Sequence, residues 1–94
     1  MFGLYVNIGK YKMKLLKFGA VWCSSCQGLA MTLGGIDHPL VESMENIDVD
    51  DSPDKMKTYD IRGVPTLIIV DDDGNELRRK SGMLPVNALK EFLG

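Results

Sequence analysis

Residues 15–26 read LLKFGAVWCSSC, and this stretch decides how the chain folds. Its first seven residues are apolar except for Lys17, which predicts a buried strand running into a loop with two cysteines. Cys23 and Cys26 are the only cysteines in the chain. Two thiols separated by two residues can close a disulfide without moving the backbone far. If a helix begins within this loop, Cys23 lies at its N-terminus, where free N–H groups and the helix dipole favour a thiolate.

Length and composition indicate a single soluble globular domain. The chain has 94 residues, of which 45% are hydrophobic and 26% charged, and its net charge is -2. This charge gives no electrostatic footprint for nucleic acid or for an anionic membrane surface, so neither is an expected partner. No apolar run approaches the ~20 residues that a transmembrane helix needs.

The expected cellular compartment indicates which role the two cysteines have. Lys10, Lys12 and Lys14 follow the first apolar residues instead of preceding them, which does not match a secretory signal, so we expect a cytoplasmic protein. In a reducing compartment a cysteine pair is more often catalytic or metal-binding than a permanent cross-link. A zinc site needs about four ligands, and the chain adds only His38 to its two cysteines, so no metal is expected.

Residues 1–12 allow two interpretations. Leu4, Val6 and Ile8 alternate with polar or aromatic residues, which predicts a short strand ending at Gly9. Alternatively, Met13 is the natural start and residues 1–12 are an extension.

The rest of the chain divides into short elements at turn residues. We expect a strand at 13–21, followed after the cysteine loop by a helix that the glycine pair 34–35 ends. A helical turn at 39–44, a strand at 45–50 and a helix at 53–59 with Ser52 as its N-cap come next. Strands at 66–70 and 76–80 are joined by a hairpin turn at 72–75, and a helix at 85–93 closes the chain. The charged strand at 76–80 is typical of a sheet edge. The three acidic residues at 71–73 belong to the hairpin and lack the pattern of a calcium loop.

The resulting order is β-α-β-α-β-β-α, an α/β fold with a mixed sheet flanked by helices. A strand, crossover helix and strand imply that the first two strands are parallel, whereas the short turn makes the last two antiparallel. The closing helix places Val86, Leu89, Phe92 and Leu93 on one apolar face.

Several motifs in this order resemble the thioredoxin family, over roughly residues 13–94. They are FGAVWCxxC at 18–26, the strand end DVD at 48–50, YxIRGVPT at 59–66, Gly74 in the hairpin and Gly82 before the last helix. A CxxC alone is a weak signal, but its combination with the tryptophan and the Gly-Val-Pro-Thr turn is specific. The region before residue 13 is too short for the family's usual first helix, so the resemblance implies a reduced thioredoxin-like fold, as in small phage and microbial members.

The resemblance also implies roles for particular residues. Cys23 matches the attacking cysteine and Cys26 the buried resolving cysteine. Val64 and Pro65 look like the family's cis-proline turn, whose backbone pairs with substrate. Trp22 would flank the disulfide and shield it from water.

We further expect Met83 to line the substrate groove, although it could simply fill a gap in the core. Ser24 and Ser25 form the loop between the cysteines and lack the family's usual proline.

Lys17 is the departure that concerns the chemistry most. It stands where the family usually places a buried carboxylate, below the second cysteine. If Lys17 points inward, we expect it to modulate Cys26, either by stabilising its thiolate or by acting as a neutral amine base. Alternatively, its side chain extends outward along the strand or pairs with an acidic residue such as Asp50.

The function implied is thiol–disulfide exchange without a cofactor beyond the redox-active disulfide. Cys23 attacks a substrate disulfide, and Cys26 then releases the reduced product. The expected partners are disulfide-containing proteins and an electron donor, either a thioredoxin-reductase-like enzyme or glutathione, and the protein is expected to be a monomer.

Two alternatives remain open. One is a glutaredoxin-like, glutathione-dependent reductase. The other is a non-catalytic interaction subunit that holds a partner through the surface around Trp22, Val64 and Met83.

Overall fold

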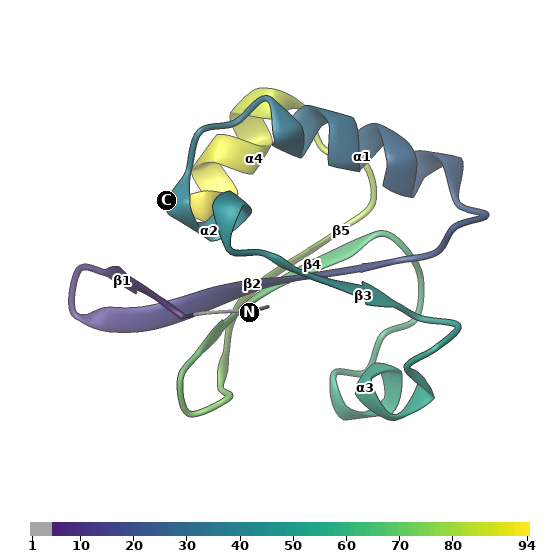
Figure 1. Cartoon of the computed structure of the whole chain (residues 1–94), viewed down its shortest axis with the longest axis horizontal. Coiled ribbons are helices and arrows are strands. Elements are labelled where there is room, and N and C mark those ends of the chain that lie inside the picture. Colours follow the sequence, from purple (N-terminus) through teal and green to yellow (C-terminus); the bar gives the residue numbers. More distant parts are fainter. Residues whose placement is uncertain (1–4) are drawn as a thin grey trace.

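The computed structural model describes residues 5–94 and shows a mixed five-stranded sheet with helices on both faces (Figure 1). The elements are β1 (Val6–Ile8), β2 (Tyr11–Gly19), α1 (Ser24–Gly34), α2 (Pro39–Glu42), β3 (Glu45–Asp48), α3 (Pro53–Thr58), β4 (Thr66–Asp71), β5 (Glu76–Ser81) and α4 (Val86–Leu93). Helices α1, α2 and α4 lie over one face of the sheet, and α3 lies over the other (Figure 1). The thioredoxin-like architecture predicted from the sequence is confirmed.

Strand β2 is the centre of the sheet. It pairs with β4 in antiparallel and with β3 in parallel orientation, and β4 pairs with β5 in antiparallel orientation. The predicted parallel and antiparallel pairs are therefore confirmed, and so is the edge position of the charged strand β5. In this register Lys17 is flanked by Asn46 of β3 and Leu67 of β4.

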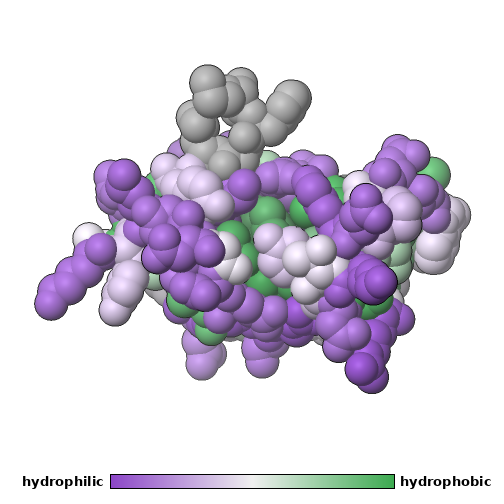
Figure 2. Space-filling model, turned by 90° about the horizontal axis from the view of Figure 1, so that it is seen from below, coloured by the Kyte–Doolittle hydropathy of each residue, from purple (hydrophilic) through white to green (hydrophobic). Residues whose placement is uncertain are grey.

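Successive residues of β2 and β4 alternate between two apolar cores. The core beneath α1, α2 and α4 contains Leu15, Ile69, Leu29, Leu33, Leu40, Leu89 and Phe92. The core on the α3 face contains Leu16, Phe18, Ile68, Val70, Ile47, Ile61 and both cysteines. Seen from the α3 side, the surface is largely hydrophilic with apolar side chains visible between the polar ones (Figure 2).

The chain before the central strand forms a hairpin. Strand β1 pairs with the start of β2, and Gly9 between them adopts a positive φ of 61° that favours glycine. The alternation therefore marks a strand, although Leu4 lies outside the described residues. Pairing with β1 starts β2 at Tyr11, two residues earlier than expected. No helix precedes β2 within the described chain.

Ser52 occupies the N-cap position of α3, as predicted, although its side chain makes no capping hydrogen bond; its backbone carbonyl accepts from Met56 N. Two other local expectations were wrong. Val86 is exposed, unlike the other apolar residues of α4. Strand β3 ends at Asp48 and not at residue 50, because the Asp48 carboxylate accepts the Asp50 N–H at 2.9 Å and turns the chain.

Candidate active site

Two cysteines meet at the start of α1. Cys23 is the N-cap residue with extended backbone angles, φ -97° and ψ 106°, and it forms a disulfide with Cys26 in the first turn. Their Cα atoms are 5.2 Å apart, within the range that a disulfide requires. The backbone N–H of Cys26 donates to the Cys23 sulfur at 3.1 Å. Cys23 is 8% exposed and Cys26 3%, so Cys23 is the more accessible of the two.

The local sequence places this pair at a helix end. Strand β2 stops at Gly19, and a short turn, in which Cys23 N donates to Ala20 O at 3.2 Å, leads into the helix. Ser24 and Ser25 are exposed residues of the first turn, which contains no acidic side chain. The free N–H groups and the positive end of the helix dipole therefore act on Cys23 without an opposing carboxylate in that turn, which favours its thiolate after reduction.

Trp22 connects the cysteine loop to the end of β3. Its indole N–H donates to Oδ2 of Asp50 at 2.9 Å, while 67% of the residue remains exposed. From the sequence, Asp50 was expected only as part of a strand-end motif and as a possible partner of Lys17; its contact with Trp22 was not foreseen. The exposed ring beside Cys23 is an apolar surface available for contact with another molecule.

A second loop approaches the cysteines from the start of β4. The Val64–Pro65 peptide bond is cis, and Val64 packs against the core that contains Cys23 and Cys26. Pro65 is buried, and its carbonyl accepts the Gly82 N–H at 2.8 Å. This bond joins the proline turn to the end of β5.

Met83 lies next to that junction and reaches the cysteine helix. It is 51% exposed, and its methyl carbon lies 3.3 Å from the position that a Cβ on Gly28 would occupy. Gly28 thus leaves space on α1 for the end of this side chain. Met83 and the proline turn therefore both lie close to the helix that carries the cysteines.

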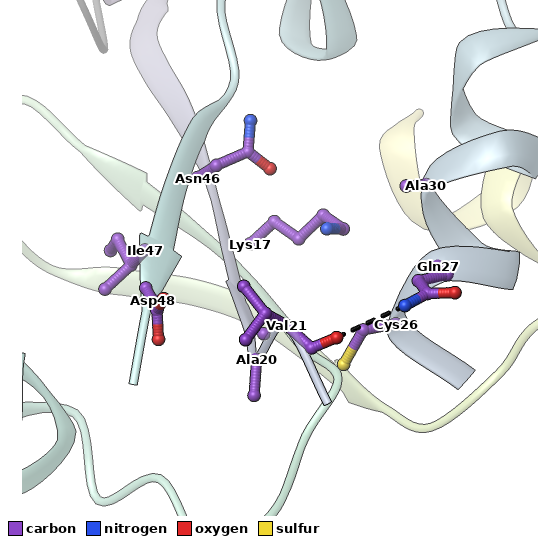
Figure 3. A pocket seen from close by; sticks show the side chains of 10 residues that line it. Lys17, Ala20, Val21, Cys26, Gln27, Ala30, Asn46, Ile47 and Asp48 are labelled. Carbon is purple, nitrogen blue, oxygen red and sulfur yellow. Dashed lines mark hydrogen bonds between the residues drawn. The ribbon is translucent and has the colours of Figure 1, made fainter. Parts of the chain in front are cut away.

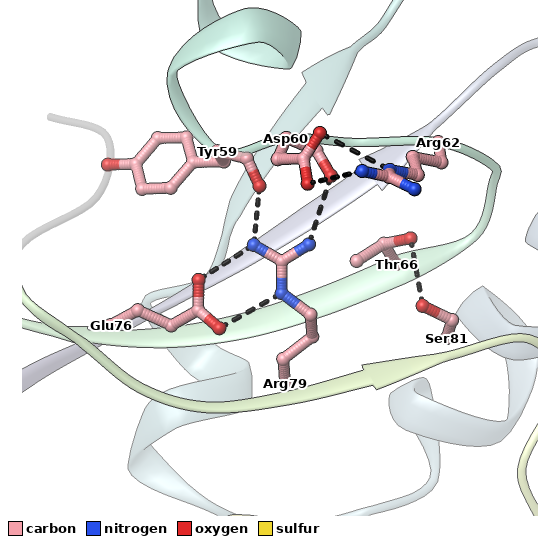
Figure 4. A network of polar contacts seen from close by, with 7 residues as sticks. All are labelled: Tyr59, Asp60, Arg62, Thr66, Glu76, Arg79 and Ser81. Atoms are coloured by element: carbon pink, nitrogen blue, oxygen red, sulfur yellow. Dashed lines mark hydrogen bonds and ion pairs between the residues drawn. The ribbon is translucent and has the colours of Figure 1, made fainter.

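Arg79 forms hydrogen bonds with the segment that precedes the proline turn (Figure 4). Its guanidinium donates to both carboxylate oxygens of Glu76, to Asp60 O at 3.2 Å and to Tyr59 O. The hydrogen bonds from Arg79 hold the pKa of Glu76 below its ordinary value. Sequence reasoning missed this role, because the charges of β5 indicate only an edge strand.

Lys17 points inward, into a cavity between β2, β3 and α1 (Figure 3). The cavity has a volume of about 270 Å³, and its lining includes Cys26, Gly19, Ala30, Asn46 and Asp48. Lys17 is 9% exposed, and burial lowers the pKa of its ammonium group. The inward alternative therefore holds, and Lys17 makes no ion pair with Asp50.

The described residues offer one acidic cluster, Asp71, Asp72 and Asp73. The Asp71 carboxylate accepts N–H groups of Asp73 and Asn75, as expected of a hairpin turn. His38 lies far from this cluster in the chain, where it caps α2 through Nδ1 and contacts Gly94 O through Nε2. None of the helices in residues 5–94 has the length and apolarity to cross a membrane.

Comparison with known proteins gives consistent similarities. The family model described as Thioredoxin matches residues 4–94. The thioredoxin of Staphylococcus epidermidis is 31% identical over 83 residues, covering 86% of this chain and 79% of that protein. The thioredoxin of Bacillus subtilis is 30% identical over 81 residues, covering 84% and 77%. Among solved structures, a single-residue mutant of the thioredoxin from Halobacterium salinarum superposes with a TM-score of 0.72 at 32% identity, covering 86% and 71%.

Proposed function

The chain belongs to the thioredoxin family, and we propose that it works as a reductant of disulfide bonds in other proteins. Its CxxC pair makes it a thiol–disulfide oxidoreductase. The observation that carries the proposed mechanism is the position of Cys23 at the N-cap of α1, with Cys26 buried behind it.

In this mechanism the Cys23 thiolate attacks one sulfur of a substrate disulfide, and the other substrate sulfur leaves as a thiolate. The helix N-terminus stabilises the attacking thiolate. Cys26 then loses its proton and attacks the Cys23 sulfur. This step forms the Cys23–Cys26 disulfide and releases the second substrate thiol, so the substrate gains the two electrons that the cysteine pair loses.

The surroundings of the pair suggest how a substrate docks. Trp22, Val64, Pro65 and Met83 form the proposed contact surface, with the Val64 backbone pairing with an extended substrate segment beside Cys23. Support comes from the exposure of Trp22 and Met83 and from the packing of Val64 against the cysteine core. Ser24 and Ser25 complete the rim of the loop.

The domain organisation, compartment and electron donor of the protein are part of the same proposal. Residues 1–94 act as one thioredoxin-like domain, as a cytoplasmic monomer, with Val6–Ile8 contributing the extra strand. A thioredoxin-reductase-like enzyme or glutathione regenerates the dithiol. The expected absence of a metal or further cofactor follows from the chemistry, which the cysteine pair completes without one.

The test is reduction of insulin disulfides driven by dithiothreitol, with the redox potential measured against glutathione on the same protein. We expect turnover above the dithiothreitol background and a potential below that of glutathione. Cys23→Ser abolishes turnover, and Cys26→Ser accumulates a mixed disulfide with substrate because the resolving thiol is missing. Ser25→Ala keeps both thiols and serves as the matched control.

Other outcomes redirect the proposal. Turnover with a potential above that of glutathione would contradict the reducing direction and favour a glutaredoxin-like or oxidising role. A folded protein without turnover would favour the interaction subunit, in which replacing both cysteines by serine leaves partner binding intact.

A further inference from the structure

The cavity below Cys26 contains the buried side chain of Lys17, and no packing or ion-pair role in the fold accounts for it. Lys17 is 9% exposed on the central strand, between Asn46 and Leu67 on the neighbouring strands. The ion pairs formed among residues 5–94 do not include it. Lysine is almost never buried to this degree without a partner, because removing an ammonium group from water is costly.

The Cys26 sulfur shares this cavity with the amino group of Lys17. A Cβ built on Gly19 would lie 3.5 Å from the Cys26 sulfur and 3.8 Å from Lys17 Nζ, so both atoms border the same small space above Gly19. Figure 3 shows the Lys17 side chain extending toward α1, on the side from which Cys26 projects. The absence of a side chain at Gly19 keeps this space open.

The charged and titratable groups facing Lys17 are few. From β3 the cavity receives Asp48, and from α1 it receives Cys26 together with the neutral amide of Gln27. From β4 the neighbour is the apolar Leu67. Asp48 forms no ion pair with Lys17 among the described residues, and its carboxylate instead accepts the Asp50 N–H. Burial alone lowers the pKa of Lys17, with no opposing contribution from a carboxylate.

We propose that Lys17 accepts the proton of the Cys26 thiol and, as an ammonium group, stabilises the Cys26 thiolate that resolves the mixed disulfide. The proposal rests on the thiol–disulfide exchange described above and deepens it. Lys17 sets the charge of Cys26 and does not touch the substrate.

The step balances without a further reactant. In the mixed-disulfide state the thiol of Cys26 and the neutral amine of Lys17 become a thiolate and an ammonium ion. The thiolate then forms the bond to the Cys23 sulfur, and the Cys23–substrate bond breaks. The departing substrate thiolate takes a proton from water, and the ammonium ion, now without an anion beside it, returns one to water through the cavity.

A thermodynamic consequence follows for the disulfide itself. The ammonium group of Lys17 gains a partner anion only in the reduced protein, so the pair stabilises the dithiol form relative to the disulfide. Replacing Lys17 by a neutral residue of similar size therefore makes the protein a stronger reductant, because a two-electron couple whose reduced form is destabilised has a lower potential.

The first test isolates Cys26 as the only thiol by using Cys23→Ser as background. Ultraviolet absorbance of the thiolate is followed against pH in this protein and after adding Lys17→Met or, as a matched control, Lys12→Met on an exposed position of the same strand. Lys17→Met is expected to raise the titration midpoint by about one pH unit or more. Lys12→Met is expected to leave it unchanged.

A midpoint that Lys17→Met does not move, in a protein with an unchanged circular dichroism spectrum, would overturn the proposal. The second test measures the equilibrium of the full protein with dithiothreitol, where Lys17→Met is expected to favour the disulfide about tenfold relative to the parent protein. An unchanged or opposite shift contradicts the proposal. Neither readout needs turnover of a protein substrate, so a failed insulin assay and a failed Lys17 titration are separate results.

Discussion

Replacing Arg79 by methionine is expected to loosen the segment that leads into the proline turn. The guanidinium donates to the backbone carbonyls of Tyr59 and Asp60, which lie just after α3, and to Glu76 on its own strand. A hydrogen bond from a charged donor contributes about 1.5–3 kcal/mol. Because the Arg79 side chain is 30% exposed, water replaces part of each lost bond, and we expect a total loss of about 2 kcal/mol.

The matched control is Arg62→Met. Arg62 pairs with the Asp60 carboxylate at 3.3 Å, but its side chain is 85% exposed. An exposed ion pair of this kind contributes ~0–1 kcal/mol, so the control is expected to lose less than about 0.5 kcal/mol. The two variants therefore separate a guanidinium that holds backbone carbonyls from one that holds only a solvated carboxylate.

Urea unfolding followed by circular dichroism measures both changes. The slope of the free energy of unfolding against urea should stay equal among the three proteins, which makes the midpoints directly comparable. If Arg79→Met lowers the free energy of unfolding no more than Arg62→Met does, the hydrogen bonds from Arg79 to the backbone carbonyls do not stabilise the segment, and the reasoning is refuted.

Two further perturbations test other parts of the fold. Gly28→Ala is expected to stabilise the protein by about 0.5–1 kcal/mol through helix propensity, because its new methyl meets only the flexible end of Met83; thermal unfolding measures this, and a loss of stability would show that Met83 cannot move. The Glu45 carboxylate accepts hydrogen bonds from Lys55 and Lys14, and these bonds lower its pKa. Its contribution to stability is therefore fully present above the ordinary glutamate pKa of about 4.3. That contribution is lost as the pH falls through the lower pKa that Glu45 has in the folded protein. Glu45→Gln should therefore be less stable than the parent protein at neutral pH and equal to it in strong acid, and a stability difference that does not depend on pH would contradict this account.

The order and orientation of the elements could be predicted because each depends on local signals. Gly34 and Gly35 end α1, and the polar hairpin turn ends β4, through backbone preferences that do not depend on the rest of the fold. The cysteine site was predictable for the same reason, since Cys23 and Cys26 are neighbours in sequence and share one helix turn.

Side-chain direction on the central strand could not be predicted. Strand β2 is buried on both faces, so Leu15 and Leu16 are both apolar and the usual alternation carries no information about where Lys17 points. Long-range polar contacts were equally hidden. The hydrogen bonds from Arg79 to Tyr59 and Asp60 join residues about twenty positions apart, and no local sequence pattern predicts which residues that far apart will form a hydrogen bond.

The pairing of β2 with β4 also bears on the order in which this protein can mature during synthesis. Leu15 lies opposite Ile69, so the central pair joins segments from opposite halves of the chain. A nascent chain cannot close its sheet until β4 has left the ribosome, because strand pairs of this separation form late. Cys23 and Cys26, by contrast, are three positions apart and can meet as soon as both are made. The two thiols can therefore meet before the cavity and the proline turn exist, and the finished fold then sets the surroundings in which they react.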